Sequence, residues 1–432
     1  MRIALRSAPQ QAIMAGTWLA ALLTLTHLAV DAVASMPAAL LPSIQARYGL
    51  TETGLAMLVA VLSFSSSVTQ PLFGALADHL GQRRVGGLGA ILTVAVLSLI
   101  GVTPSIALLV LLFLIGGVGS AAFHPAGASM TRGAGVKHKG LAMSLFSAGG
   151  TVGVALGPIL VVSVVAVYGL NATPWLMAPG IVLGLLIWLA GRPQPRAPSS
   201  PGAAKVGLRI VRGPVGLLVL AGLFNSIVVV TFNSALPLWL VSQGISRDSA
   251  VIGWTLAAFA LAAASGGIIA STLMQRVPRA YLASGTMLLA LLPLLAIFVV
   301  EPGTPLFFAA VVLAGALVQA SFPLLVVSAQ DLVPDAVATV SGMLMGFSTG
   351  VAGMLYIGIG YLQTTLGVGR AMQLAFLALI PAAAIAFTVL TRARVAIEQS
   401  PEKPGTDACS CTVCRCAQCS VAGLDRQLVA AQ

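Results

Sequence analysis

The chain contains twelve long apolar stretches, and this pattern restricts its fold more than any other feature. A bilayer core is about 30 Å thick, which an α-helix crosses in about 20 residues. Since backbone polar groups must find partners inside lipid, each stretch is expected to be helical. We therefore predict an all-α integral membrane protein of twelve transmembrane helices. The expected spans lie near 17–42, 53–77, 85–102, 105–130, 140–168, 173–191, 214–242, 250–274, 281–300, 304–328, 340–365 and 372–391.

Composition excludes a water-soluble globule. Hydrophobic residues make up 58% of the chain and charged residues only 8%, whereas about a quarter of the residues of soluble domains are charged. The sequence has no G-x-x-x-x-G-K-[ST] phosphate loop and no soluble segment large enough for a nucleotide domain. We therefore expect neither an enzyme nor an ATP-driven pump. No basic run is interleaved with aromatic residues, so no nucleic-acid partner is expected.

The basic residues are unevenly distributed between the two ends of the expected spans. If the N-terminus is cytoplasmic, the 22 lysines and arginines all fall on the cytoplasmic side except Arg47, Arg247 and Arg370. Such an excess marks the cytoplasmic face of a membrane protein. We expect a multi-pass protein of the plasma (inner) membrane with both termini in the cytoplasm.

A polar segment, 192–213, divides the chain. It is rich in Pro, Ser, Gly and basic residues, which is typical of a cytoplasmic linker. Similar Leu-Pro pairs, ending at Pro42 and Pro237, are each followed seven residues later by a glycine. This repeat predicts six-helix halves at 1–191 and 214–391, followed by a tail at 392–432. Repeated halves around a midplane site are typical of secondary transporters that rock one bundle against the other.

The segment GALADHLGQRR lies between the second and third expected spans. Gly74 and Gly81 permit a tight helix-to-helix reversal, Asp78 lies near a helix end, and Arg83 and Arg84 are expected at the lipid head groups. An ordinary positive loop would account for the arginines but not for the spacing of the aspartate and glycines. The segment resembles the G-x-L-x-D-x-x-G-x-R-R signature of the major facilitator superfamily, which implies that these five residues take part in gating.

Further blocks of sequence resemble the fosmidomycin-resistance subfamily of major facilitator exporters. With the signature above, they run through most of residues 17–391. This resemblance implies proton-coupled efflux of small, often anionic or antibiotic compounds. The blocks are His27 to Pro42, Phe123 to Arg132, Gly140 to Pro158, Gly169 to Gly180 and Ala329 to Gly353.

Ionisable residues inside the expected spans are few. His27 and Asp31 are four residues apart, so they share one face of the first helix. A carboxyl at that depth costs about 2.5–3.5 kcal/mol and is expected to face the bundle interior. The pair is either a proton relay or a structural link between helices. His124 precedes Pro125, an expected helix break. Many drug/proton exchangers have an arginine where this chain has Phe113, so His124 or His27 is expected to replace its role in proton release.

Two further sets of residues are candidates for function. Gly153, Gly157 and Pro158 resemble the G-x-x-x-G-P antiporter motif of drug/proton exchangers, and they predict either a pivot between the halves or a simple packing face. The second half has no acid matching Asp31, so titration is expected in the first half. Neutral polar and aromatic residues are candidates for the substrate cavity, namely Gln70, Asn225, Asn233, Trp239, Gln319 and Tyr356.

All five cysteines fall within the tail. On a reducing cytoplasmic side such density favours a thiolate site for a soft metal ion over disulfides, although the cysteines could equally be incidental. No other cofactor is expected. The cysteines form the pattern C-x-C-x₂-C-x-C-x₂-C at Cys409, Cys411, Cys414, Cys416 and Cys419.

The preferred interpretation is a secondary active transporter that exports a small antibiotic-like or metabolite compound in exchange for protons. The alternative is efflux of a thiophilic metal or metalloid, such as arsenite, mercury or copper, with the tail as collector or sensor. Uptake of a small solute and a non-transport role are less favoured. The expected partners are the lipid bilayer, a small-molecule substrate and protons, and the chain is expected to be a monomer.

Overall fold

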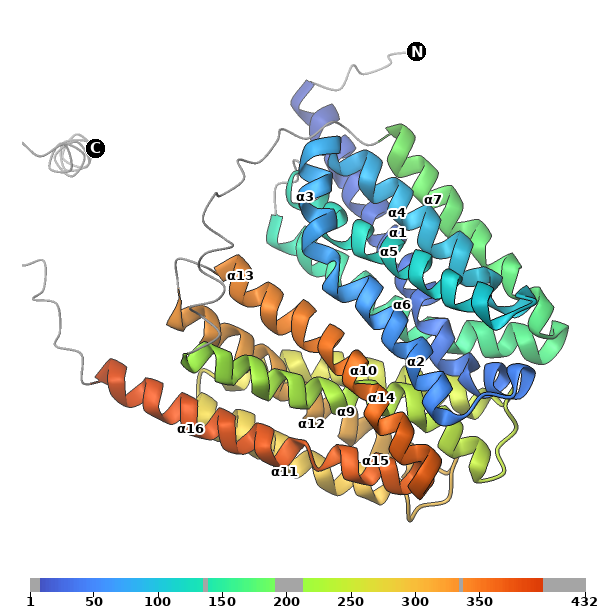
Figure 1. The fold of residues 1–432 in the computed structure, drawn as a ribbon. Coiled ribbons are helices and arrows are strands. Elements are labelled where there is room, and N and C mark those ends of the chain that lie inside the picture. Colours follow the sequence, from blue (N-terminus) through green and yellow to red (C-terminus); the bar gives the residue numbers. More distant parts are fainter. Residues whose placement is uncertain (1–7, 135–138, 191–212, 334–336, 399–432) are drawn as a thin grey trace, which may run out of the picture. The chain divides into compact units, whose positions relative to one another are not determined.

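The computed structural model describes residues 8–134, 139–190, 213–333 and 337–398, and within these ranges the chain forms helices and no strand. The described residues up to Thr391 form one compact unit. The predicted cysteine site lies outside the described residues. The α-helices are α1 (Ala8–Tyr48), α2 (Glu52–Ser63), α3 (Gln70–Leu80), α4 (Gln82–Ser98), α5 (Ile106–Arg132), α6 (Lys139–Tyr168), α7 (Met177–Ala190), α9 (Pro214–Ser242), α10 (Ala250–Leu273), α11 (Arg279–Ala296), α12 (Pro305–Leu332), α13 (Val337–Gly342), α14 (Ser348–Leu366), α15 (Val368–Phe376) and α16 (Leu379–Glu398) (Figure 1).

Eleven of the described helical segments are individually long and apolar enough to cross a membrane. A bent pair, 52–68 with 70–80, makes up to twelve. This confirms the predicted all-α membrane fold. The first helix is longer than expected, because α1 continues through Pro37 and Pro42 to Tyr48.

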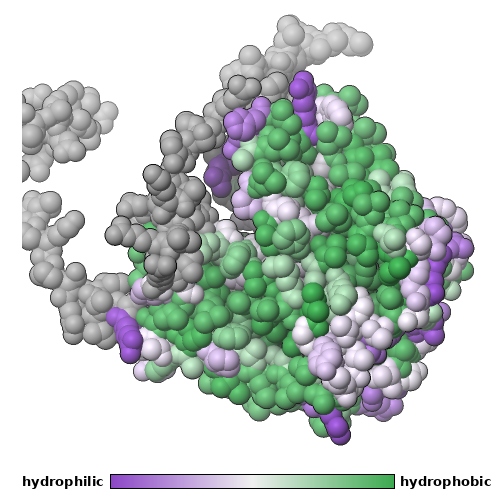
Figure 2. Space-filling model, viewed as in Figure 1, coloured by the Kyte–Doolittle hydropathy of each residue, from purple (hydrophilic) through white to green (hydrophobic). Residues whose placement is uncertain are grey.

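The surface of the described residues suits a lipid environment. Figure 2 shows hydrophobic residues over most of the visible face, with hydrophilic residues gathered toward its ends. Large apolar side chains are strongly exposed, including Leu189 at 74% and Val299 at 85%. Since apolar surface costs about 25 cal/mol per Å² in water, this face is stable only against lipid tails.

The predicted reversal between the second and third spans is much shorter than expected. Helix α3 continues to Leu80 and α4 begins at Gln82, so Gly81 alone joins them, with φ 101° and ψ 128°. Gly74 was expected to help the chain reverse, and that prediction is wrong, because Gly74 lies inside α3 facing Pro125. One left-handed glycine is enough for the turn.

The loops define two sides of the membrane-spanning bundle. We call the side of Gly81 the Gly81 side, and the opposite side the Gly49 side. Five further glycines with positive φ follow odd-numbered spans and therefore lie on the Gly49 side, namely Gly49, Gly169, Gly244, Gly303 and Gly367.

The helices of the two predicted halves pack against each other mainly in three pairs, α2 with α14, α6 with α10 and α1 with α9, and α1 also touches α10. Glycines allow the closest approaches. A Cβ atom at Gly353 would lie 2.1 Å from the side chain of Ser63, and one at Gly253 would lie 3.0 Å from the carbonyl oxygen of Pro158. The division into halves stays a prediction, because 191–212 is outside the described residues.

Two π-helical turns, η1 (Phe64–Val68) and η5 (Met343–Phe347), lie at the α2–α14 contact and touch each other. Hydroxyl groups satisfy carbonyl oxygens near both turns. Ser65 donates to the carbonyl of Phe113 in α5, and Ser348 donates to the carbonyl of Val219 in α9. Each irregular turn is thereby fixed to a neighbouring helix, and α3 continues from η1 at an angle of 42°.

Gly81→Ala should destabilise the protein by about 1–3 kcal/mol, because a Cβ has free space at Gly81 but the backbone conformation disfavours it. Gly74→Ala is the matched control. Gly74 lies inside α3, the helix that ends at Gly81, its Cβ would make an ordinary 3.6 Å contact with Pro125, and alanine favours the helix. Thermal unfolding in detergent should show a lower Tm for Gly81→Ala only. Equal melting of the two variants would contradict this account of the turn.

Candidate functional site

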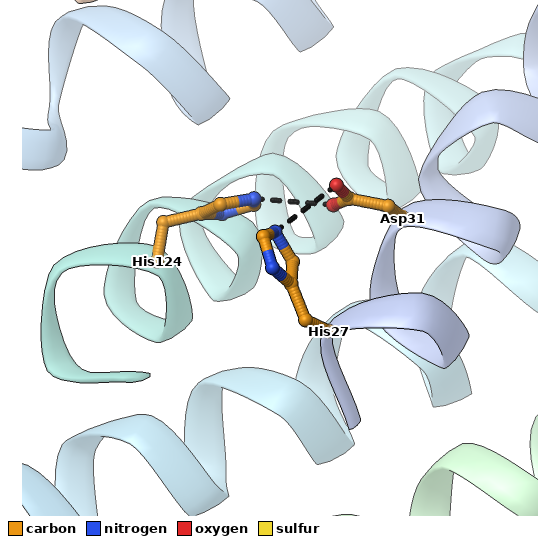
Figure 3. A group of neighbouring side chains, drawn as sticks. All are labelled: His27, Asp31 and His124. Atoms are coloured by element: carbon orange, nitrogen blue, oxygen red, sulfur yellow. Dashed lines mark hydrogen bonds and ion pairs between the residues drawn. The ribbon is translucent and has the colours of Figure 1, made fainter. Parts of the chain in front are cut away.

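Three ionisable side chains meet between α1 and α5: His27, Asp31 and His124 (Figure 3). The Nε2 atom of His27 lies 3.2 Å from Asp31 Oδ2, and Nε2 of His124 lies 3.1 Å from Asp31 Oδ1. Helix geometry places His27 beside Asp31 on α1, one turn apart. Asp31 therefore lies between two imidazoles, each on a separate carboxylate oxygen. We call these three residues the Asp31 cluster.

Each imidazole is held by a backbone carbonyl on its other side. His27 Nδ1 lies 2.7 Å from the carbonyl oxygen of Phe146 in α6, and His124 Nδ1 lies 2.8 Å from that of Ser120. The Ser120 hydroxyl is farther from His124 Nδ1, at 3.3 Å. A carbonyl oxygen can only accept a hydrogen bond, so these contacts require a proton on Nδ1 of both rings.

This arrangement sets how many protons the Asp31 cluster needs. A neutral ring with its proton on Nδ1 presents only a lone pair at Nε2. A carboxylate oxygen also presents lone pairs, so each contact between Nε2 and Asp31 is a hydrogen bond only when a further proton lies between the two atoms. Both bonds are complete when two such protons are present, and the cluster then has a net charge of +1. Loss of one proton turns one contact into a repulsion.

The Asp31 cluster is largely enclosed. The exposed fraction of the side chain is 10% for His27, 15% for Asp31 and 27% for His124. Phe146 stacks on His27 with the ring centroids 4.2 Å apart. Hydrogen bonds and charges interact strongly in such a poorly hydrated site. His124 is the most accessible member of the cluster.

The Asp31 cluster also has the composition of a cation site. One ligand atom from each of the three residues can be chosen so that all lie within 4.8 Å of one another. Among the described residues, this is the one group of three or more histidine, cysteine or acidic side chains with this spacing. The short Nε2 to oxygen distances suit shared protons directly, without any further ion.

Helix α5 does not break at Pro125 as expected. It runs from Ile106 to Arg132 with Pro125 inside it. His124 therefore projects from a continuous helix, and its position is set by α5 packing against α1.

The predicted gating residues lie in two separate places. On the Gly81 side, Asp78 accepts a hydrogen bond of 2.6 Å from Gln82, across the turn, and Arg84 is exposed one residue after Arg83. Gly153 and Gly157 instead lie where α6 meets α1. Cβ atoms there would lie 2.3 Å and 2.0 Å from carbonyl oxygens of α1. Pro158 adjoins this contact and faces Gly253 of α10.

The predicted substrate-cavity residues do not form one cluster by any contact of the described side chains. Trp239 packs edge-on against Phe298, and Tyr356 accepts a hydrogen bond from Gln363. Gln70 donates to the carbonyl of Ser66 in η1, and Asn233 donates to the carbonyl of Val229, one turn earlier in α9. Their role in binding stays a prediction.

Asn225 differs from the other cavity candidates. It is only 1% exposed, and neither amide atom has a hydrogen-bond partner. Gln319 has an unpartnered Oε1. Buried polar atoms are normally paired. Among the six cavity candidates, Asn225 and Gln319 are therefore the two whose unpaired amide atoms have no structural explanation.

Sequence reasoning missed two parts of the site, both in α6. The carbonyl of Phe146 holds His27, and the absent side chain of Gly150 leaves room for His27 and Asp31. A backbone acceptor has no sequence signal. Gly150 could have been found from its spacing, since it lies three residues before Gly153 on the face that packs against α1.

Comparison with known proteins agrees with this fold. The chain is 27% identical over 347 residues to the fosmidomycin resistance protein of Escherichia coli (strain K12), covering 77% of this chain and 83% of that protein. It is also 27% identical over 368 residues to YfnC, an uncharacterised MFS-type transporter of Bacillus subtilis (strain 168), covering 81% and 88%. These relatives support the resemblance inferred from the sequence.

Solved structures show the same fold. A bacterial homologue of the human lysosomal transporter Spinster matches with a TM-score of 0.70 at 19% identity, covering 89% of this chain and 98% of that one. The nucleoside transporter NupG matches with a TM-score of 0.70 at 14% identity, covering 86% and 99%. The sequence matches the profile of the Major Facilitator Superfamily over residues 23–355 and, in a second match, 218–410. The chain therefore belongs to the major facilitator superfamily, and it is a membrane transporter rather than an enzyme.

Proposed function

We propose that the protein is a proton-coupled exporter of a small antibiotic-like or metabolite compound. The observation that carries this proposal is the position of Asp31 between His27 and His124, inside the membrane-spanning segments. An acidic residue there is costly unless it has a partner or a function. The fosmidomycin resistance protein, to which this chain is similar, supports export and the antibiotic-like class of substrate by its name.

Proton binding at the Asp31 cluster would be coupled to movement of helices. With both shared protons present, Asp31 attracts both imidazoles and holds α1 near α5. When one proton leaves, two lone pairs face each other at about 3 Å, and the contact becomes unfavourable. Proton loading therefore favours one arrangement of α1, α5 and α6, and proton release favours another. Exchange of a proton for substrate then follows from alternating access between the two sides.

The substrate class is tested by a growth-inhibition panel in a drug-sensitive bacterial host that expresses the full chain. The panel contains antibiotics of several charge types together with arsenite, mercury and copper salts. Protection against one or more antibiotics, lost in a strain that makes the Asp31→Asn variant, is the expected result. Protection against metals alone would contradict the proposal.

Asp31→Asn should abolish proton-driven transport while the protein still folds. The amide keeps the volume, but it removes the negative charge that stabilises the protonated form of both imidazoles. We expect pH-gradient-driven transport in proteoliposomes to fall about tenfold or more, a usual size for coupling between two ligands. His79→Gln is the control, since His79 is exposed on α3. Wild-type rates with an unchanged pH dependence in Asp31→Asn would reject the cluster as the proton site.

We further propose that Asn225 contacts the substrate. Asn225→Leu should stabilise the substrate-free protein by about 1–3 kcal/mol, because it removes unpaired buried polar atoms, and it should also reduce transport. Ser284→Ala is the control, since Ser284 is a buried polar residue outside the candidate cavity set and already has a backbone partner. The experiment measures the Tm of each variant in detergent and the antibiotic resistance of cells that express it. Full resistance in Asn225→Leu would mean that this residue only packs.

The cysteine-rich tail supports a second candidate function, efflux of a thiophilic metal. Replacing all five cysteines by serine keeps the chain length and every residue of the spans. If the tail only buffers or senses metal, antibiotic resistance should stay within about twofold of wild type, because the substitutions leave every residue of the spans in place. Metal resistance that exists in wild type and collapses in this variant would favour the second candidate.

A further inference from the structure

Helix α6 packs against the His27–Asp31 pair at Gly150, which has no side chain. A Cβ atom at Gly150 would lie 2.6 Å from both Cε1 and Nε2 of His27, and 2.7 Å from Asp31 Oδ2. Real Cβ contacts are longer than this, so any side chain at this position would displace the pair. Gly150 is therefore the residue whose size decides whether His27 Nε2 and Asp31 Oδ2 can stay at 3.2 Å.

The same helix also holds the other end of the His27 ring. The carbonyl of Phe146, one turn before Gly150, lies 2.7 Å from His27 Nδ1, and the Phe146 ring stacks on the imidazole. The ring is thus held at Nδ1 by α6 and bounded at Nε2 by α6. The ring therefore cannot shift toward α6. A change in the distance between His27 and Asp31 requires α1 and α6 to move relative to each other.

We propose that Gly150 and the Phe146 carbonyl are positioning elements of the proton site, and that α6 is the helix that moves when the site loads or releases its proton. This inference rests on the proposed proton coupling at the Asp31 cluster. The two residues act through His27 and Asp31, and neither exchanges a proton itself.

The rest of α6 connects the proton site to the second predicted half through its contacts with α1 and α10. Gly153 and Gly157 press α6 against α1, where an added Cβ would meet α1 carbonyl oxygens at 2.3 Å and 2.0 Å. Immediately after them, the carbonyl of Pro158 packs against Gly253 of α10. A shift of α6 therefore changes the contact between α6 and α10, which joins the two predicted halves. Alternating access requires contacts between the halves to change.

Other charges near the pair are few. Helices α2, α4, α5, α6, α7, α9 and α10 pack against α1. Of these, α7, α9 and α10 contain no histidine and no charged residue, and His124 is the titratable group that α5 brings to the pair. The remaining charged residues of these helices stand at or near helix ends, namely Glu52, Arg83, Arg84, Arg132 and Lys139. A change in proton binding therefore reports on the Asp31 cluster.

The test compares Gly150→Ala with Gly149→Ala in the purified full chain. Gly149 is a close control, because its Cβ would also meet α1 at 2.6 Å, but against the carbonyl oxygen of Thr24 instead of the proton pair. Proton uptake is measured with a pH-indicator dye in weakly buffered detergent, with Asp31→Asn as the reference in which the imidazoles lack the carboxylate that stabilises their protonated form. Gly150→Ala should need about three- to tenfold more protons for half-loading, because the charge-assisted bond between His27 and Asp31 is weakened. Gly149→Ala should load as wild type does.

The outcomes separate this inference from the proposed function. If wild type and Asp31→Asn take up protons identically, the proposed function fails. If wild type loads at a lower proton concentration than Asp31→Asn, but Gly150→Ala and Gly149→Ala give the same midpoint, the positioning role is overturned.

A second measurement covers the case in which Gly150→Ala does not fold. Spin labels are placed on α6 and α4 through Val167→Cys and Leu88→Cys, two exposed positions, with the tail cysteines replaced by serine. The distance between the labels should change between acidic and alkaline pH in an otherwise wild-type chain, and should stay constant with Asp31→Asn. A constant distance in both chains would overturn the inference.

Discussion

The rest of the site depends on one physical constraint: every hydrogen bond to Asp31 needs its own proton. In both histidines Nδ1 donates to a backbone carbonyl, so a neutral ring has no proton left to donate from Nε2. The contacts at 3.1 Å and 3.2 Å are therefore favourable only in the loaded form. A carboxyl in the membrane costs about 2.5–3.5 kcal/mol on insertion scales. Its partners offset that cost only while the protons remain, which makes the cluster sensitive to proton supply.

Close helix packing makes this sensitivity useful. Helix α6 lies so near α1 that Cβ atoms at Gly150, Gly153 and Gly157 would overlap α1 atoms. In lipid, where apolar surfaces gain little by meeting each other, such close backbone contact is a main source of helix association. A loosely packed α6 would absorb a change at His27 by side-chain motion. A tightly packed α6 must transmit it, and its next contact lies at Gly253 of α10.

The sequence predicted the features that depend on one helix at a time. Apolar length predicted the spans, and the spacing of four residues placed His27 beside Asp31. Contacts between helices were harder to predict, because they depend on rotation and depth that periodicity does not define. His124 was a candidate, but its bond to Asp31, across 93 residues, was not foreseen. The backbone acceptor at Phe146 leaves no trace in residue identity, and Gly74 was misplaced because one glycine suffices for the turn.

The central claim is that both cluster histidines keep a proton on Nδ1 and exchange it only at Nε2. The direct test is solid-state nitrogen NMR of the full chain in lipid, with ¹⁵N-labelled histidine. Only four histidines are present, and His27→Gln and His124→Gln assign the two signals. Between acidic and alkaline pH, Nδ1 of both residues should stay protonated while Nε2 gains and loses its proton. A neutral form with the proton on Nε2 and a bare Nδ1 in either residue would contradict the account.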